Sequence, residues 1–291
     1  MAPAARVLMC PPDHYAIQYE INPWMSRNRP SDHGLAVRQW RRLYELLEQA
    51  GAEISCLAPV AGLPDLVFTA NAGLVYEDTV MLSRFRYRQR RGEEPHFQRW
   101  FSEHGFRVQR LRTAACFEGA GDGLFCGDTL FAGYRRRSDA VAIQEIGALL
   151  GCRVIPLELV RPHYYHLDTC FCPLAPDLAV YYPDAFDDYG GAVLQESIAR
   201  LIPVAKEEAQ RFACNAVVVG RTVITNTGCP ELRSRLEALG FATYETPLSE
   251  FVKAGGSAKC LTLRLDGEEA AAWKQRTRVA QPPSAVQNCS D

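Results

Sequence analysis

Residues Leu124–Leu157 read LFCGDTLFAGYRRRSDAVAIQEIGALLGCRVIPL, and the order of elements within this stretch decides the fold class. Two apolar runs, separated by Gly127 and Asp128, predict a β-hairpin with a tight turn. The periodic stretch from Ser138 to Leu150 then predicts a helix that ends at Gly151. The apolar run that follows predicts a third strand. The stretch is therefore one unit of hairpin, helix and strand.

This order of elements recurs about every 50 residues along the chain, which is typical of similar units arranged around a centre. The sequence thus predicts an α/β fold in a single domain over residues 1–266. The polar, proline-containing segment 267–291 is predicted to be a flexible tail. The elements expected outside the quoted stretch are Arg6–Cys10, His33–Gly51, Ala52–Leu57, Leu66–Val75, Thr79–Phe85, Pro95–His104, Arg107–Leu111, Tyr164–Pro173, Leu178–Tyr182, Val193–Leu201, Ala213–Val219, Val223–Asn226, Pro230–Leu239, Ala242–Glu245 and Cys260–Leu265.

Composition and charge exclude several classes of protein. The 291 residues are 47% hydrophobic and carry a formal net charge of -2, so there is no overall positive field to hold nucleic acid or an anionic membrane. No apolar run approaches the roughly 20 residues of a membrane span. The eleven cysteines are odd in number within a long chain, which indicates reduced thiols. We therefore expect a cytoplasmic protein with a small-molecule substrate, and the sequence leaves a homo-oligomer open.

Four groups of residues could carry chemistry. Cys260 follows a glycine pair and Lys259, which would favour a thiolate at an accessible strand start. His166 and Asp168 alternate on an expected strand, which places an imidazole and a carboxylate on one face. Glu118 precedes a glycine-rich turn. The fourth group is Asp65 and Asn71. Asp65 lies just before a second expected strand, and Asn71 lies six residues further on, on the same face.

Other interpretations of these residues stay open. His163, His166, Cys170 and Cys172 could be drawn as a metal site, but on a strand they would spread over about 20 Å, too far for one tetrahedral shell. A thiol redox enzyme would use Cys170 and Cys172, which lack the Cys-x-x-Cys spacing. A non-catalytic protein that binds arginine would keep the carboxylates and would not need Cys260.

Taken together, the motifs resemble those of the guanidino-group modifying enzymes, which include arginine deiminase, dimethylarginine dimethylaminohydrolase and the amidinotransferases. The resemblance extends from about Leu8 to Leu265. It rests on these segments: Asp65-x-x-Phe68-Thr69-x-Asn71, Arg90, Phe117-Glu118-Gly-Ala-Gly-Asp122, Gly133-Tyr-Arg-Arg-Arg137-Ser138, His166-Leu-Asp168 and Gly256 to Cys260-Leu-Thr.

A closer resemblance is to the cyanobacterial-type arginine dihydrolases, which remove both terminal nitrogens of arginine and yield ornithine. It is carried by Met9-Cys-Pro-Pro-Asp-His-Tyr15, Ile21-Asn-Pro-Trp-Met25, Phe68-Thr-Ala-Asn-Ala-Gly73 and His166-Leu-Asp-Thr-Cys-Phe-Cys-Pro173. The resemblance implies a five-bladed α/β propeller, the pentein fold, with no metal and no organic cofactor. The alternatives within the family are a dimethylarginine dimethylaminohydrolase and an arginine deiminase that yields citrulline.

The resemblance also implies a role for each site residue. Cys260 would be the nucleophile that forms a covalent thiouronium intermediate, and His166 the general acid and base. Carboxylates would hold the guanidinium, and the neutral Asn71 would let a half-reacted ureido group stay bound for a second cycle. The expected catalytic set is Cys260, His166, Glu118 and Asp168, and the expected substrate-binding set is Asp65, Asn71, Arg90, Arg137, Asn22 and Asp122, of which Arg90 and Arg137 would clamp the substrate's α-carboxylate.

Overall fold

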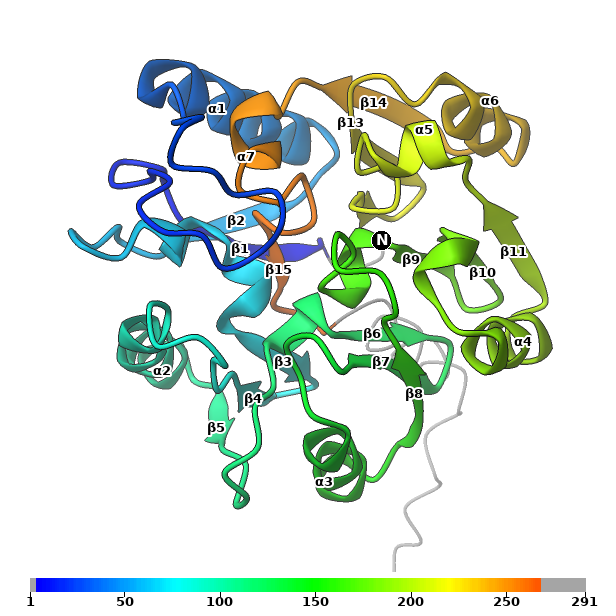
Figure 1. Cartoon of the computed structure of the whole chain (residues 1–291), viewed down its shortest axis with the longest axis horizontal. Coiled ribbons are helices and arrows are strands. Elements are labelled where there is room, and N and C mark those ends of the chain that lie inside the picture. The colour runs from blue at the N-terminus through cyan, green and yellow to red at the C-terminus, as the bar shows by residue number, and fades with distance from the viewer. Residues whose placement is uncertain (1–3, 268–291) are drawn as a thin grey trace, which may run out of the picture.

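The computed structural model describes residues 4–267 as five small sheets of three strands arranged around a common centre (Figure 1). The helices lie on the outside of this ring. This is the predicted α/β architecture, and it is the arrangement of the pentein fold. The predicted tail lies outside the described residues, except for Gly267. No helix in the described part of the chain has the length and apolarity needed to cross a membrane.

The quoted stretch forms one complete unit of the ring. β6 (Gly123–Cys126) and β7 (Thr129–Tyr134) form an antiparallel hairpin, α3 (Ala140–Leu150) follows, and β8 (Arg153–Glu158) pairs parallel to β7. The left-handed backbone of Gly127, with φ 61°, makes the tight hairpin turn that its sequence predicts. Gly151 ends α3 in the same left-handed conformation.

Three further units repeat this pattern. Each has an antiparallel hairpin followed by a helix and a parallel third strand. They are β3 (Gly73–Tyr76), β4 (Thr79–Leu82), α2 (Glu94–Glu103) and β5 (Arg107–Gln109); β9 (Phe171–Ala175), β10 (Leu178–Tyr181), α4 (Asp188–Ser197) and β11 (Arg200–Pro203); and β12 (Val217–Val219), β13 (Thr222–Asn226), α6 (Pro230–Ala238) and β14 (Ala242–Thr246).

The fifth sheet pairs the first and the last strand of the described residues. β1 (Arg6–Met9) lies between β15 (Leu263–Arg264), which is antiparallel to it, and β2 (Glu53–Cys56), which is parallel. The amide of Leu265 donates to the carbonyl of Arg6 at 2.7 Å. The long helix α1 (His33–Gln49) connects β1 to β2, and its N-cap Asp32 accepts a hydrogen bond from the amide of Leu35 at 2.8 Å.

A turn precedes the inner strand of each sheet, and the inner strands are β3, β6, β9, β12 and β15. The sequence prediction was wrong in detail at these turns. The expected strand Leu66–Val75 is instead a pair of 3₁₀ turns, η1 (Pro64–Val67) and η2 (Thr69–Ala72), before β3. The expected strand Tyr164–Pro173 begins with η5 (Leu167–Thr169), so His166 and Asp168 do not share a strand face. A buried apolar run does not by itself distinguish a strand from a tight turn.

Other boundaries differ less. The expected helix Val193–Leu201 begins earlier, at Asp188, and ends at Ser197. The last residues of the expected helix belong to the strand β11. The expected strand Cys260–Leu265 is only the two-residue β15. Five short elements were not expected: α5 (Lys206–Ala209), α7 (Ser249–Val252), η3 (Arg91–Glu93), η4 (Gly119–Gly121) and η6 (Pro183–Ala185).

The apolar core lies between the sheets and their covering helices, in three clusters. Phe97, Phe101 and Ile146 are among the outer residues that bury against the strands. Burial of a side chain of this size stabilises the fold by about 1.5–3 kcal/mol. The core therefore holds the five units as a rigid ring, which fixes the positions of the turns at its centre.

Candidate active site

The candidate site lies at the centre of the ring, where each unit contributes the turn that precedes its inner strand. Asn71 is in η2 before β3, Glu118 is the N-cap of η4 before β6, and Asp168 is in η5 before β9. Asn215 precedes β12, and Cys260 lies in the turn before β15. Residues far apart in the sequence therefore meet because the repeated unit places each of them at an equivalent point.

Cys260 is buried and lies between two polar partners. Its Sγ lies 3.3 Å from Oδ2 of Asp168 and accepts a hydrogen bond from Nδ2 of Asn215 at 3.1 Å. Oδ1 of Asn215 also accepts from the amides of Ser257 at 3.0 Å and Cys260 at 3.2 Å. Burial and the Asp168 carboxylate raise the pKa of the Cys260 thiol well above its usual value. Beside Asp168 the sulfur is therefore a thiol, and a cation next to it would favour the thiolate.

His166 belongs to a second buried group. Its Nε2 lies 2.7 Å from Oε2 of Glu118, and the same oxygen accepts from Nη1 of Arg137 at 2.9 Å. Burial lowers the pKa of the His166 imidazole to about 4, against the opposing effect of Glu118. Burial opposes the ionisation of Glu118, but Arg137 and His166 outweigh it and hold the pKa of that carboxyl well below its usual range. At neutral pH a neutral imidazole thus faces an ionised carboxylate.

A third group orients Asn71. Nη1 of Arg90 donates to Oδ1 of Asn71 at 2.8 Å, and Nδ2 of Asn71 donates to the carbonyl of Glu118 at 2.9 Å. The buried Glu93 binds Arg90 with both oxygens, at 2.9 and 2.8 Å. Asp65 lies 4.0 Å from the same guanidinium. Because each polar atom of Asn71 has a protein partner, its amide is held in one orientation.

At least one member of each group lines a small cavity. Gly255, with φ +84°, lets the chain turn beside Tyr165, whose hydroxyl donates to its carbonyl at 2.8 Å. Gly256 packs against the Phe68 ring so closely that a Cβ there would lie 2.6 Å from a ring carbon. The lining residues are Ile21, Asn22, Met25, Asp65, Phe68, Asn71, Arg90, Arg137, Tyr165, Ala254 and Cys260.

The predicted substrate-binding residues differ in position. Asp65, Asn71, Arg90 and Arg137 line the cavity. Asn22 also lines it, although its Oδ1 accepts from the amide of Trp24 at 2.9 Å and its Nδ2 donates to the carbonyl of Ala254, so it also shapes the wall. Their contacts with substrate stay predictions.

Asp122 is predicted to bind substrate, and two hydrogen bonds hold its side chain. Its carboxylate accepts from Oγ of Ser138 at 2.6 Å and from the amide of Leu167 at 3.1 Å, and the second bond joins neighbouring units. Asp122 is not among the cavity-lining residues, and neither are His166, Glu118 and Asp168. The contact of Asp122 with substrate therefore stays a prediction.

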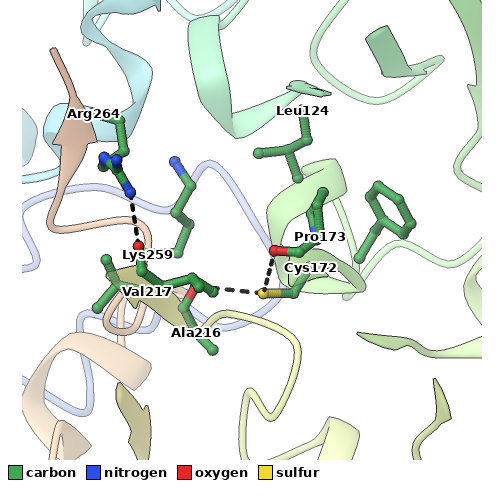
Figure 2. Close-up of a pocket in the computed structure, with 9 residues that line it drawn as sticks. Leu124, Cys172, Pro173, Ala216, Val217, Lys259 and Arg264 are labelled. Carbon is green, nitrogen blue, oxygen red and sulfur yellow. Dashed lines mark hydrogen bonds between the residues drawn. The ribbon is translucent and has the colours of Figure 1, made fainter. Parts of the chain in front are cut away.

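Lys259 lies apart from the cavity that holds Cys260. Figure 2 shows its side chain in a separate pocket, near Arg264 and the apolar residues Leu124 and Val217. Lys259 is not among the residues that line the cavity of Cys260. Neighbouring residues of the turn before β15 therefore line different pockets.

The metal and redox interpretations find no geometric support within residues 4–267. That part of the chain holds no group of three or more His, Cys, Asp or Glu side chains arranged to bind a metal ion. Cys170 and Cys172 are both buried and form no disulfide, as is true of most of the described cysteines. Their sulfurs lie near backbone carbonyl groups, as Figure 2 shows for Cys172.

Sequence reasoning missed three residues of the site. Asn215 stands inside an apolar run, and only its place before the fourth inner strand marks it. Glu93 lies in the charged stretch Arg91-Gly-Glu-Glu, which is typical of solvated surface. Tyr165, whose ring lies 4.6 Å from the guanidinium carbon of Arg137, was passed over beside His166.

The arrangement suits a planar cation. Carboxylates beside a nucleophilic sulfur would accept from the fork of N–H donors of a guanidinium, and the bound cation would lower the pKa of the thiol. The neutral imidazole of His166 can accept and then donate a proton. A ring of five such units with this centre defines the class of guanidino-group modifying enzymes. The chain belongs to the dimethylarginine dimethylaminohydrolase family, because residues 16–266 match the family described as "N,N dimethylarginine dimethylhydrolase, eukaryotic".

Comparison with individual proteins shows which members of this class the chain is similar to. The chain is 47% identical, over 91% of its length, to the bifunctional arginine dihydrolase/ornithine cyclodeaminase ArgZ of Synechocystis sp., and it spans 38% of that protein's length. It is 38% identical to the N(G),N(G)-dimethylarginine dimethylaminohydrolase of Mycobacterium tuberculosis, over 89% of this chain and 85% of the relative. The crystal structure of the N-terminal domain of ArgZ bound to substrate superimposes with a TM-score of 0.88 at 47% identity, covering 91% of this chain and 98% of that one.

Proposed function

We propose that this chain is an arginine dihydrolase, which converts arginine and two waters into ornithine, two ammonia molecules and CO₂. The observation that carries the proposal is the Cys260 thiol in a small cavity, within 3.3 Å of the Asp168 carboxylate and with the oriented amide of Asn71 in the same lining. The similarity to ArgZ supports this choice among the reactions of the family.

In the first cycle, the substrate guanidinium binds near Asp65 and Asp168, and its charge favours the Cys260 thiolate. The Cys260 thiol passes its proton to His166 as the sulfur bonds to the guanidinium carbon, and His166 gives that proton to the departing nitrogen, which leaves as ammonia. A water then attacks the thiouronium carbon and loses a proton to His166. The sulfur leaves, which yields a bound ureido group and restores the thiol.

In the second cycle, Cys260 attacks the ureido carbon and a second ammonia leaves. Hydrolysis of the resulting thiocarbamate gives a carbamate, which loses CO₂ and leaves ornithine. Asn71 has one protein bond at each polar atom, so one amide hydrogen and one lone pair stay available for the ureido group. An aspartate here would place an oxygen against the carbonyl of Glu118.

Hydrolysis of dimethylarginine is a second candidate, because the family match and the mycobacterial relative both favour it. A mass-spectrometric product assay on arginine, dimethylarginine and citrulline separates the two. We expect ornithine and two ammonia per arginine, without accumulation of citrulline. The Cys260→Ala variant should keep its fold and lose essentially all turnover.

Three outcomes would contradict the proposal. Stoichiometric citrulline with one ammonia would make the protein a deiminase. Dimethylamine release with a higher kcat/KM than arginine turnover would make it a dimethylargininase. Arginine binding without turnover would make it a binding protein.

A further inference from the structure

A broad groove lies beside the reactive cavity, where the segment 22–31 and the residues after β8 face α5 and α7. Its volume is about 950 Å³, many times that of the cavity that holds Cys260. Trp24, Tyr164 and Tyr182 give it aromatic surface. The indole Nε1 of Trp24 donates to the carbonyl of His163 at 2.8 Å, which joins two of the lining segments.

The charged side chains that line the groove are nearly all basic. They are Arg29, Arg161, Lys206, Arg211 and Lys253, against the single carboxylate Asp184. Lys253 is neutralised by Glu250 at 2.7 Å. The other basic side chains are exposed.

The remaining cations have no acidic partner. Arg29 donates to the carbonyl of Trp24 at 2.9 Å, and Arg161 donates to the backbone carbonyl of Asp184 at 3.2 Å. Neither bond cancels a charge. Within residues 4–267, Lys206 and Arg211 make no side-chain hydrogen bond and no ion pair. The groove is therefore a positive region on a chain whose formal net charge is -2.

We propose that this groove binds a small organic polyanion that carries two or more phosphate or carboxylate groups. Guanidinium forks match both groups, and several separate cations suit several separate charges. The aromatic surface suits the organic part of such a molecule. A single monovalent anion would leave most of these cations unpaired.

The groove shares a wall with the reactive cavity. Asn22, which lines the cavity, accepts a hydrogen bond from the amide of Trp24, which lines the groove. Lys253 in the groove adjoins Ala254 in the cavity lining. A bound polyanion would therefore contact the segments that shape the cavity, so its occupancy should change the KM for substrate.

Calorimetric titration of the full chain with pyrophosphate and, separately, with citrate tests the proposal. The Lys206→Glu/Arg211→Glu variant should lose binding by roughly tenfold or more, since it reverses two unpaired charges. The Arg38→Glu/Arg41→Glu variant is the matched control, because it makes the same charge change on exposed residues of α1 outside the groove. We expect the control to bind within about twofold of the wild type and its affinity to fall with added salt.

The two probes separate the sources of the ligand. Tighter binding of pyrophosphate would assign phosphate esters, and tighter binding of citrate would assign polycarboxylates. The proposal is wrong if the wild type binds neither anion at low salt, if binding exceeds one site per chain, or if both variants lose affinity equally. The effect on the KM for arginine is a second readout that rests on the proposed function, whereas the calorimetry does not.

Discussion

Replacing Asn215 by alanine should cost both stability and turnover. The side chain is fully buried and makes four hydrogen bonds, to Asp168, Ser257 and, twice, Cys260. Alanine would leave two buried N–H groups and one carbonyl without this partner, each at about 1–3 kcal/mol. Because both N–H groups share one acceptor, we expect a combined loss of about 3–5 kcal/mol in the free energy of unfolding.

Turnover should fall for a separate reason. Nδ2 of Asn215 donates to the Cys260 sulfur, and a hydrogen bond to a charged group contributes about 1.5–3 kcal/mol. Loss of that bond to the thiolate predicts a fall in kcat of about ten- to a hundredfold. The Asn215→Asp variant would keep an acceptor but place a carboxylate beside the sulfur, so its activity should fall further.

Asn226→Ala is the matched control, because that buried asparagine makes two hydrogen bonds away from the reactive cavity. Urea unfolding should show a smaller loss than for Asn215→Ala, and ammonia release should give a kcat close to that of the wild type. Equal denaturation midpoints for Asn215→Ala and the wild type, or equal kcat for the two alanine variants, would refute the reasoning.

Three further predictions follow from the buried charges. The folded pKa of His166 lies near 4, below its unfolded value of about 6.5, so the unfolded chain binds more protons and stability should fall by about 2 kcal/mol from pH 7 to pH 5. Urea titrations should show a smaller fall for His166→Gln, and an equal fall would contradict this role. Glu93→Gln should loosen Arg90 and hence Asn71, so product analysis should show citrulline beside ornithine, and an unchanged ratio would argue against the network. Alkylation of Cys260 by iodoacetamide, followed by peptide mass spectrometry without substrate, should accelerate up to pH 9 and beyond, because the thiol pKa is raised; a plateau near neutral pH would contradict that shift.

The repeated unit could be predicted because apolar runs, glycines and helical periodicity recur in the same order. The turns before the inner strands could not. Residues 66–75 are almost all buried, so their apolar run looks like a strand although Asn71 stands in a 3₁₀ turn. Periodicity reports which side chains are buried and not how tightly the backbone turns.

The residues of the candidate site could be predicted only where the sequence carries a motif. Cys260 lies against Asp168 and His166 against Glu118, and the catalytic roles that the resemblance implies for them stay predictions. Asn215 belongs to no such motif. Its role depends on a turn of the fourth unit that meets Cys260 only after the ring forms.

The pairing of β15 with β1 has a consequence for how activity arises. The nucleophile is carried by the turn before the last described strand, and that strand docks on the first. During synthesis the carboxylates and the histidine emerge long before Cys260. A nascent chain therefore holds most of the proposed guanidinium-binding site but not its nucleophile. Contacts between such distant segments form late and slow folding. In the proposed mechanism, ring closure is thus the step that brings the nucleophile to the surface that binds arginine.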